Sequence, residues 1–444
     1  MYLRKHIVST FQLAYPVVIG QLGIVMMGVV DSLMVGQLGA APLAAASLGN
    51  GMAFIVMIIG IGISMAVTPL VAIAVGAGKY EDCGIYFRQS LLVNSVISII
   101  TAVIIYFAAD LIQYFDQPKE VQNQAISYVR IIGLSSIPLL LFQSYKQFIE
   151  GLSVMRPAMI ISLIANIVNV FVNWLLIFGN LGLPKLELDG AGWATFASRL
   201  FMAIVLILFV MSNKYFKQYD VTFHFKSINR AVIKKILALG LPSGLQYFFE
   251  IGAFSFAVVM VGWLGTKQLA AHQIAINLAS ISFMAALGIS AAGSIRVGNA
   301  VGQKNIQETR IAGFTASLMG ASIMFISGII FVVFRNFLPT LYISDEVVIS
   351  YASSLLVIAA LFQLSDGVQA VGIGILRGLT DVKIPTAITF ISYWIVGLPI
   401  GYLLGFNFEH GVQGVWIGLL LGLTTSAILL TLRFNSRSKH LITT

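Results

Sequence analysis

The first half of this chain recurs in its second half, 226 residues further along. An ungapped comparison of positions 13 to 76 with positions 239 to 302 gives 20 identities. Pro16 returns as Pro242, and the stretch Met34–Gly39 returns as Met260–Gly265 with one substitution. A hydrophobic chain made of two like halves is typical of transporters whose substrate path lies between the halves.

The apolar stretches predict an all-α integral membrane protein. The chain is 58% hydrophobic and only 10% charged, whereas soluble domains carry about 25% charged residues. A β-barrel is disfavoured because barrel strands alternate polar and apolar residues, and these stretches are apolar on all sides. Twelve spans are expected, most of them longer than the ~20 residues that cross a bilayer: residues 12–37, 46–76, 88–113, 127–148, 156–181, 191–212, 234–263, 270–300, 310–337, 347–375, 384–405 and 411–433.

The basic residues predict the orientation in the membrane. With both termini in the cytoplasm, 18 of the 26 Lys and Arg residues fall in cytoplasmic segments, as the positive-inside rule requires. The net charge of +9 is therefore a topology signal and no argument for nucleic-acid binding. We expect a multi-pass protein of the plasma (inner) membrane without a cleavable signal peptide. The single cysteine, Cys83, offers neither a disulfide framework nor a cysteine metal site.

The chain divides into two predicted six-helix bundles, residues 1–212 and 236–444, joined by a basic cytoplasmic linker, residues 213–235. Six spans return the chain to the same side of the membrane, so the second bundle starts with the orientation of the first. The repeats are then parallel and pseudo-symmetric, and the two bundles enclose a central cleft. The linker is interpreted as an orientation signal, with contact to anionic membrane lipids as a secondary role.

Three acidic residues lie deep in predicted spans: Asp31, Glu250 and Asp366. An acid at the centre of a membrane helix costs ~2.5–3.5 kcal/mol, so it commonly marks an ion or proton path. Glu250 and Asp366 fall about 22 Å and 16 Å from the cytoplasmic edge at ~1.5 Å per residue, which lets them share a proton or a Na⁺ ion. No Lys or Arg lies within one helical turn of these acids in the sequence.

Paired amides accompany these acids. Asn169 and Asn173 are four residues apart, hence on one helix face, where they can coordinate an ion, hydrogen-bond Asp31 or simply join helices. Gln273 and Asn277 have the same spacing in span 8. Together with Asn169, Asn173 and Phe362, they are predicted to support the ion site or to line the substrate cleft. The neighbouring His272 is interpreted as structural or interfacial. The chain contains no phosphate-binding loop, no metal-binding His/Cys pattern and no nucleophile elbow, so we expect a non-enzyme without a cofactor, driven by an ion gradient.

These features together resemble the multidrug and toxic compound extrusion (MATE) transporters, and within them the bacterial NorM-like branch. The resemblance covers essentially the whole chain. It rests on specific segments, none of which is sufficient alone: Pro16, Gly28–Asp31 and Val35–Gly36 in span 1, Pro242 and Glu250 in span 7, Ala270–Gln273 and Asn277 in span 8, and Asp366–Gln369, Leu376–Gly378 and Asp381 around span 10.

The resemblance implies export of bulky, often cationic compounds in exchange for Na⁺ or H⁺. Glu250 and Asp366 match the family's second-lobe cation site, and Asp31, with Asn169 and Asn173, matches its first-lobe polar site. Some NorM-like proteins have a Tyr one turn before the span 10 acid, and here that residue is Phe362. A Na⁺ ion at Glu250 and Asp366 would therefore lack this hydroxyl ligand.

Other classes of protein fit the sequence less well. A flippase for lipid-linked oligosaccharides, of related architecture, needs several Arg or Lys residues in its cleft to hold pyrophosphate, and only Arg199 is clearly internal. A channel gains its charged rings from oligomeric symmetry, whereas this chain carries its own pseudo-symmetry. We therefore expect a transporter that functions as a monomer, with small organic cations and membrane lipids as its partners.

Overall fold

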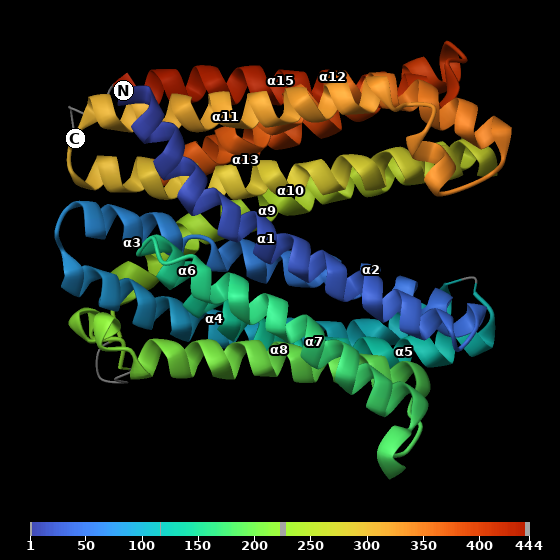
Figure 1. The fold of residues 1–444 in the computed structure, drawn as a ribbon, viewed down its shortest axis with the longest axis horizontal. Coiled ribbons are helices and arrows are strands. Elements are labelled where there is room, and N and C mark those ends of the chain that lie inside the picture. The colour runs from blue at the N-terminus through green and yellow to red at the C-terminus, as the bar shows by residue number, and fades with distance from the viewer. Residues whose placement is uncertain (1, 116, 223–227, 440–444) are drawn as a thin grey trace. The chain divides into compact units, whose positions relative to one another are not determined.

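The computed structural model describes residues 2–115, 117–222 and 228–439. In this part of the chain the regular elements are helices, and twelve helical stretches are long and apolar enough to span a membrane (Figure 1). This confirms the predicted number of spans and the all-α fold. Several helices begin before the predicted spans, because their first turns carry polar residues that extend beyond the apolar core.

The twelve stretches follow one another along the chain. They are α1 (Tyr2–Gly36), α2 and α3 (Ala40–Ser64, Val67–Gly76), α4 and η1 (Tyr80–Ala108, Ala109–Tyr114), α5 and α6 (Lys119–Leu134, Ser136–Gly151), α7 (Arg156–Phe178), α8 (Glu187–Ser212), α9 (Arg230–Leu264), α10 (Thr266–Gly302), α11 (Ile306–Val333), α12 (Glu346–Gly378), α13 through η7 (Lys383–Asn407) and α15 (Gly411–Lys439). Short 3₁₀ helices, η2 (Asn180–Gly182), η3 (Lys214–Tyr219) and η5 (Leu338–Leu341), lie between them.

The helices form two compact units. Unit 2 is residues 19–244, and unit 1 is residues 1–18 together with residues 245–444. Residues 18 and 244 are 226 positions apart, which is the offset of the sequence repeat. The first helix of each half therefore begins in the unit that the other half mainly forms: α1 begins in unit 1, and α9 begins in unit 2. The division of the chain into bundles 1–212 and 236–444 with a linker stays a prediction.

Equivalent glycines accommodate this exchange. A Cβ atom at Gly62 of α2 would overlap the backbone of Gly244 in α9, within unit 2. At the repeat-equivalent position in unit 1, a Cβ atom at Gly288 of α10 would overlap the side chain of Val18 in α1. Small residues let membrane helices approach closely, since no hydrophobic driving force acts between helices in lipid. The same helix contact therefore occurs once in each unit.

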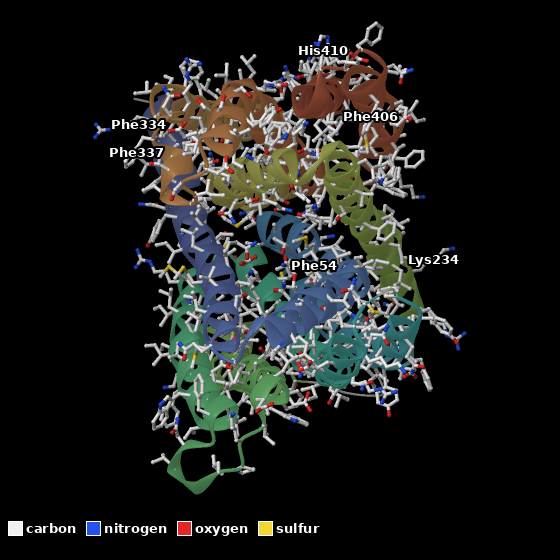
Figure 2. The ribbon with its side chains drawn as sticks, turned by 90° about the vertical axis from the view of Figure 1, so that its right-hand side faces the viewer. Phe54, Lys234, Phe334, Phe337, Phe406 and His410 are labelled. Atoms are coloured by element: carbon white, nitrogen blue, oxygen red, sulfur yellow. The ribbon has the colours of Figure 1, made fainter. Side chains whose placement is uncertain are left out.

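In unit 1, helices α10, α11, α12 and α15 run side by side (Figure 1). The span from Lys383 to Asn407 consists of α13 (Lys383–Phe390), a π-helical segment η6 (Ile391–Gly397), α14 (Leu398–Tyr402) and a second π-helical segment η7 (Leu403–Asn407). Pro399 lies in α14 and has no backbone N–H group, so a carbonyl group one turn earlier loses its helical hydrogen bond. Local π-helical turns can satisfy a carbonyl group that a proline leaves free. Aromatic side chains just after the end of α11, Phe334 and Phe337, are exposed (Figure 2).

In unit 2, α7 packs on α8, α2 on α5, and α6 on both α4 and α8. The described part of the linker packs on this unit. Phe216 and Tyr219 of η3 are 1% and 3% exposed, and Arg88 of α4 pairs with the Asp220 carboxylate at 2.6 Å. Residues 223–227 of the linker lie outside the described residues. The start of the linker is thus bound to unit 2 by packing and an ion pair.

Candidate functional site: two buried acid clusters

Asp31 is the centre of a polar cluster in unit 2, which we call the Asp31 cluster: Asp31, Asn169, Asn173 and Thr195. The Asn173 amide donates to Asp31 Oδ1 at 2.6 Å and to Asn169 Oδ1 at 3.1 Å. The Thr195 hydroxyl of α8 donates to Asp31 Oδ2 at 3.1 Å. Both carboxylate oxygens of an intramembrane acid are therefore hydrogen-bonded, which offsets part of its burial cost.

The Asp31 cluster also keeps unused polar atoms. Asn169 and Asn173 are both fully buried. Within the described chain, Asn169 Nδ2 and Asn173 Oδ1 complete no hydrogen bond of normal geometry, although the Asn169 amide also interacts with the Asp31 carboxylate. A buried amide group without a partner costs about 1–3 kcal/mol, so these atoms are suited to a water molecule, an ion or a polar substrate group.

Sequence reasoning joined Asp31 with Asn169 and Asn173 but missed the contributions of α5 and α8. Thr195 and Arg199 are four residues apart on α8, the same spacing that singled out Asn169 and Asn173. Arg199 and Tyr128 of α5 both interact electrostatically with Asp31. The absence of a basic residue near Asp31 in the sequence is thus misleading, since the fold brings one in from another helix.

Glu250 of α9 and Asp366 of α12 form the second cluster, in unit 1, which we call the acid pair. Glu250 is 7% and Asp366 is 5% exposed, and the two carboxyl groups lie close enough to repel each other. The structure thus brings together the two acids that the sequence placed at similar depth. Arg377, at the end of α12, also interacts electrostatically with Glu250, although it is eleven residues from Asp366 in the sequence.

Unused polar groups surround the acid pair as well. The Gln369 amide and the Tyr393 hydroxyl lie beside the Glu250 carboxyl. Neither group completes a hydrogen bond of normal geometry with any described residue. Carboxylate, amide and hydroxyl oxygens are the ligands that hard cations prefer, and the same carboxyl groups can carry a proton. The described residues hold no group of three or more His, Cys, Asp or Glu that could bind a metal ion.

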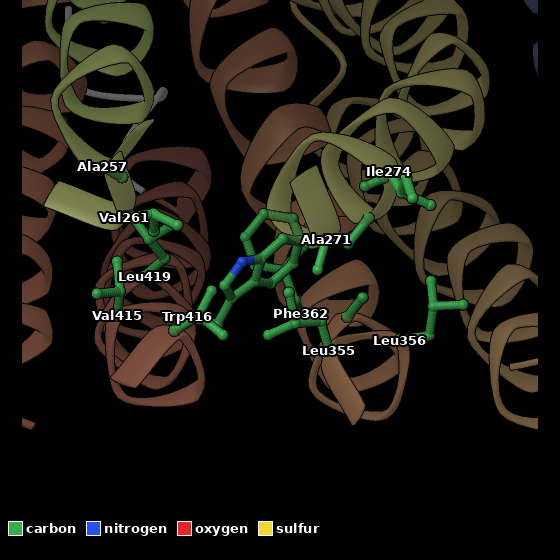
Figure 3. Close-up of a cluster of buried hydrophobic side chains, with 14 of the residues drawn as sticks. Ala257, Val261, Ala271, Ile274, Leu355, Leu356, Phe362, Val415, Trp416 and Leu419 are labelled. Carbon is green, nitrogen blue, oxygen red and sulfur yellow. The ribbon is translucent and has the colours of Figure 1, made fainter. Parts of the chain in front are cut away.

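Phe362 lies one turn before Asp366, in an apolar cluster (Figure 3). Its ring is 2% exposed and packs against the rings of Trp416 and Phe254, with centroids 5.4 Å and 6.0 Å away. The Trp416 indole N–H donates to His272 Nδ1 at 3.0 Å, which gives His272 the structural role that was expected. In this conformation Phe362 is a core residue, and its role in a substrate cleft stays a prediction.

Gln273 and Asn277 lie on the exposed face of α10. Asn277 accepts a hydrogen bond from the Tyr342 hydroxyl at 3.1 Å. Their role as cleft residues also stays a prediction.

Comparison with known proteins agrees with this geometry. Twelve spans in two like halves, with an acid cluster inside each compact unit, are typical of a transporter built from repeats. The family model for MatE matches residues 16–175 and 242–403, once in each half. The chain belongs to the multidrug and toxic compound extrusion (MATE) family.

Relatives and solved structures cover nearly the whole chain. Multidrug resistance protein NorM of Vibrio vulnificus is 35% identical over 404 residues, 90% of this chain and 88% of that protein. Multidrug resistance protein MdtK of Yersinia enterocolitica is 35% identical over 407 residues, 91% of this chain and 89% of that protein. The crystal structure of the eukaryotic MATE transporter AtDTX14 has a TM-score of 0.88 at 21% identity, covering 99% and 98% of the two chains. A MOP superfamily transporter from Pyrococcus furiosus has a TM-score of 0.90 at 20% identity, covering 99% and 97%.

Proposed function

We propose that this protein is a secondary active multidrug efflux antiporter. It exports cationic and amphipathic organic compounds in exchange for H⁺ or Na⁺ by alternating access. The observation that carries the proposal is that each compact unit holds an acid within a membrane helix, with polar atoms beside it that form no hydrogen bond of normal geometry. Relatives at 35% identity that are named multidrug resistance proteins support the same function.

Antiport requires that the two ligands prefer different states of the protein, because a ligand with equal affinity for both states shifts nothing. The acid pair binds the coupling ion, and the Asp31 cluster responds to protonation or to the drug. An anionic cluster attracts a cationic drug and a coupling cation alike, so the two compete. The protein acts as a monomer in the inner membrane with both termini in the cytoplasm.

The test is ethidium efflux from proteoliposomes that contain the purified protein, under an imposed Na⁺ gradient or an imposed proton gradient. Efflux driven by Na⁺ alone would assign the acid pair as a Na⁺ site despite Phe362. Efflux driven by protons alone would assign carboxyl titration as the coupling step. If neither gradient drives efflux, the multidrug proposal is wrong and the flippase alternative gains ground.

The double variant Glu250→Gln, Asp366→Asn gives the first specific prediction. We expect it to fold, since both substitutions keep the shape of the side chain, but to lose gradient-driven efflux to the level of empty liposomes. Glu409→Gln is the matched control, because Glu409 is an exposed acid in the connection before α15. Normal ion-driven efflux by the double variant would refute the role of the acid pair.

A further inference from the structure

A groove lies on the surface of unit 1 between α12 and α15. Its volume is about 330 Å³, and its walls are mainly apolar. On α12 it is lined by Leu364 and Val368, which lie two residues before and two residues after Asp366. At 3.6 residues per turn, both side chains leave the opposite side of the helix from that acid. The groove is therefore separate from the acid pair.

The hydroxyl groups that line the groove already donate hydrogen bonds within the protein. Thr424 and Thr431 each donate to the backbone carbonyl group one turn earlier, at 2.7 Å. Ser365 and Thr424 share a hydrogen bond of 2.8 Å, in which Ser365 is then the donor. Apolar side chains such as Ile428 and Leu432 remain exposed. Such a wall suits a hydrocarbon chain, which gains packing contacts without needing hydrogen bonds.

The length of the groove also fits an acyl chain. Along α15 its lining extends from Thr424 to Leu432, which is about 12 Å at ~1.5 Å per residue. One leaflet supplies about 15 Å of the ~30 Å hydrocarbon core of a bilayer. The groove can therefore hold most of one acyl chain that belongs to a single leaflet.

A cation lies at one end of this groove. Arg310 of α11 donates to the backbone oxygen of Asn435 at 3.2 Å, to Asn435 Oδ1 at 3.0 Å and to the Ser438 hydroxyl at 3.0 Å. Asn435 and Ser438 are four and seven residues after Thr431, so they lie on the face of α15 that lines the groove. The guanidinium group is therefore about one helical turn beyond Thr431.

Arg310 keeps both charge and hydrogen-bond donors for a ligand. In the part of the chain that the structure describes, no carboxylate lies within ion-pair distance of it: Glu308 lies 3.7 Å from His6, and Asp381 pairs with Arg433 at 2.8 Å. Its three hydrogen bonds use three of the five guanidinium N–H groups. The guanidinium fork matches phosphate oxygens, and basic pockets between helices on the cytoplasmic side bind lipid headgroups.

We propose that the groove is a binding site for one anionic phospholipid of the inner leaflet. One acyl chain lies along α12 and α15, and the phosphate group binds Arg310, whose end of the groove is cytoplasmic when both termini are in the cytoplasm. The lipid then joins α11 to α15. A cationic drug is disfavoured here, because its charge would be repelled by Arg310. Neither acid cluster takes part, so lipid binding does not depend on the proposed antiport.

The test measures lipid binding to the purified full-length protein in detergent by native mass spectrometry. The two lipids are phosphatidylglycerol and phosphatidylcholine with identical acyl chains. Arg310→Gln removes the charge, Arg310→Lys keeps it, and Val368→Phe fills the groove. Leu361→Phe is the matched control for the groove, since Leu361 is exposed two turns earlier on the same face of α12 and does not line it. Lys383→Gln controls for the loss of an exposed positive charge elsewhere in unit 1.

We expect the wild type to bind one phosphatidylglycerol about fivefold more tightly than phosphatidylcholine, which is the contribution of one cation near a membrane surface. Arg310→Gln should abolish this preference, and Arg310→Lys and both controls should keep it. Val368→Phe should lose both lipids, which tests the groove even if Arg310→Gln fails to fold.

Equal binding of the two lipids by the wild type would overturn the inference. The same holds for an unchanged preference in Arg310→Gln, or for unchanged phosphatidylglycerol binding in Val368→Phe. A protein dimer that Val368→Phe dissociates would assign the groove to a second copy of the chain and would equally overturn it.

Discussion

At the scale of the residue, Thr195 gives the sharpest test of the Asp31 cluster. Its hydroxyl is the only group from α8 that hydrogen-bonds Asp31 in the described structure, and Thr195 is 5% exposed. Thr195→Val removes this donor with almost no change of volume. Hydrogen bonds to charged groups contribute about 1.5–3 kcal/mol, so we expect efflux to fall roughly tenfold or more.

The matched variant is Thr195→Ser, which keeps the hydroxyl and should retain most of the activity. The measurement is the initial rate of ethidium efflux in proteoliposomes at equal protein content. Equal activity of the Val and Ser variants would show that the hydrogen bond from α8 plays no part in the function of Asp31.

At the scale of the element, the start of α12 depends on Asp345. Its side chain accepts hydrogen bonds from the backbone of Val347 and Val348 at 2.9 Å and 3.2 Å, as an N-cap does. It also pairs with Lys267 at 3.1 Å. The hydrogen bond from Lys267, first of all, lowers the pKa of Asp345 below its ordinary value, and the hydrogen bond from the Val348 backbone acts in the same direction.

A pH-dependent contribution to stability follows from this lowered pKa. The ionised form is favoured in the folded protein, so its contribution is present above the ordinary pKa of about 4 and is lost as the pH falls through the lower folded value. Asp345→Asn keeps the cap but removes the charge, and we expect a lower Tm at pH 7. The difference from wild type should shrink below about pH 4, as measured by differential scanning fluorimetry. A Tm difference that stays constant from pH 7 into this acid range would contradict the assignment.

Also at this scale, a row of glycines on α15 packs closely against a row of glycines on the span from Lys383 to Asn407. The contacts pair Gly422 with Gly397, Gly418 with Gly401 and Gly414 with Gly405. A Cβ atom at Gly418 would overlap the Gly401 backbone, and backbone cannot move aside as a flexible side chain can. Gly418→Ala should therefore destabilise unit 1 by at least about 1–3 kcal/mol.

The control for this prediction is Gly28→Ala, because no atom lies within 4 Å of a Cβ atom at Gly28 of α1. Alanine is favoured over glycine inside a helix by about 1 kcal/mol, so the control should be neutral or stabilising. Thermal unfolding in detergent compares the two variants. A Gly418→Ala protein as stable as the control would mean that the helices separate at little cost.

At the scale of the whole molecule, the sequence predicted best what depends on burial in lipid. The number of spans and the three deep acids follow from hydropathy and depth, and the repeat predicted two like halves. The sequence could not predict that Thr195 and Arg199 interact with Asp31, because the rotation of α8 relative to α1 is set by packing between helices. Gln369 and Tyr393 beside Glu250 were missed for the same reason. The exchange of helix starts between the units also has no local signal, although Pro16 and Pro242 lie just before its boundaries.

The repeat-equivalent contacts at Gly62 and Gly288 give the last prediction. In unit 2 a Cβ atom at Gly62 meets backbone atoms of Gly244 and Ser243. In unit 1 a Cβ atom at Gly288 would overlap the Val18 side chain first, and it would also lie 2.9 Å from the Ala14 carbonyl oxygen and 3.2 Å from the Val18 backbone nitrogen. Gly62→Ala should therefore destabilise the protein more than Gly288→Ala, each by about 1–3 kcal/mol or more.

The two contacts differ in whether a second substitution can relieve them. Val18→Ala removes the methyl groups that an alanine at position 288 would overlap, so the double variant should regain part of the stability that Gly288→Ala loses. Gly51→Ala, on the same helix as Gly62 but with no atom within 4 Å of its Cβ position, controls for the change of residue type. The Tm values of the single and double variants form a double-mutant cycle, which measures the interaction between the two sites. Strictly additive effects of Val18→Ala and Gly288→Ala would show that the start of α1 does not contact α10. Residues 1–18 would then not belong to unit 1.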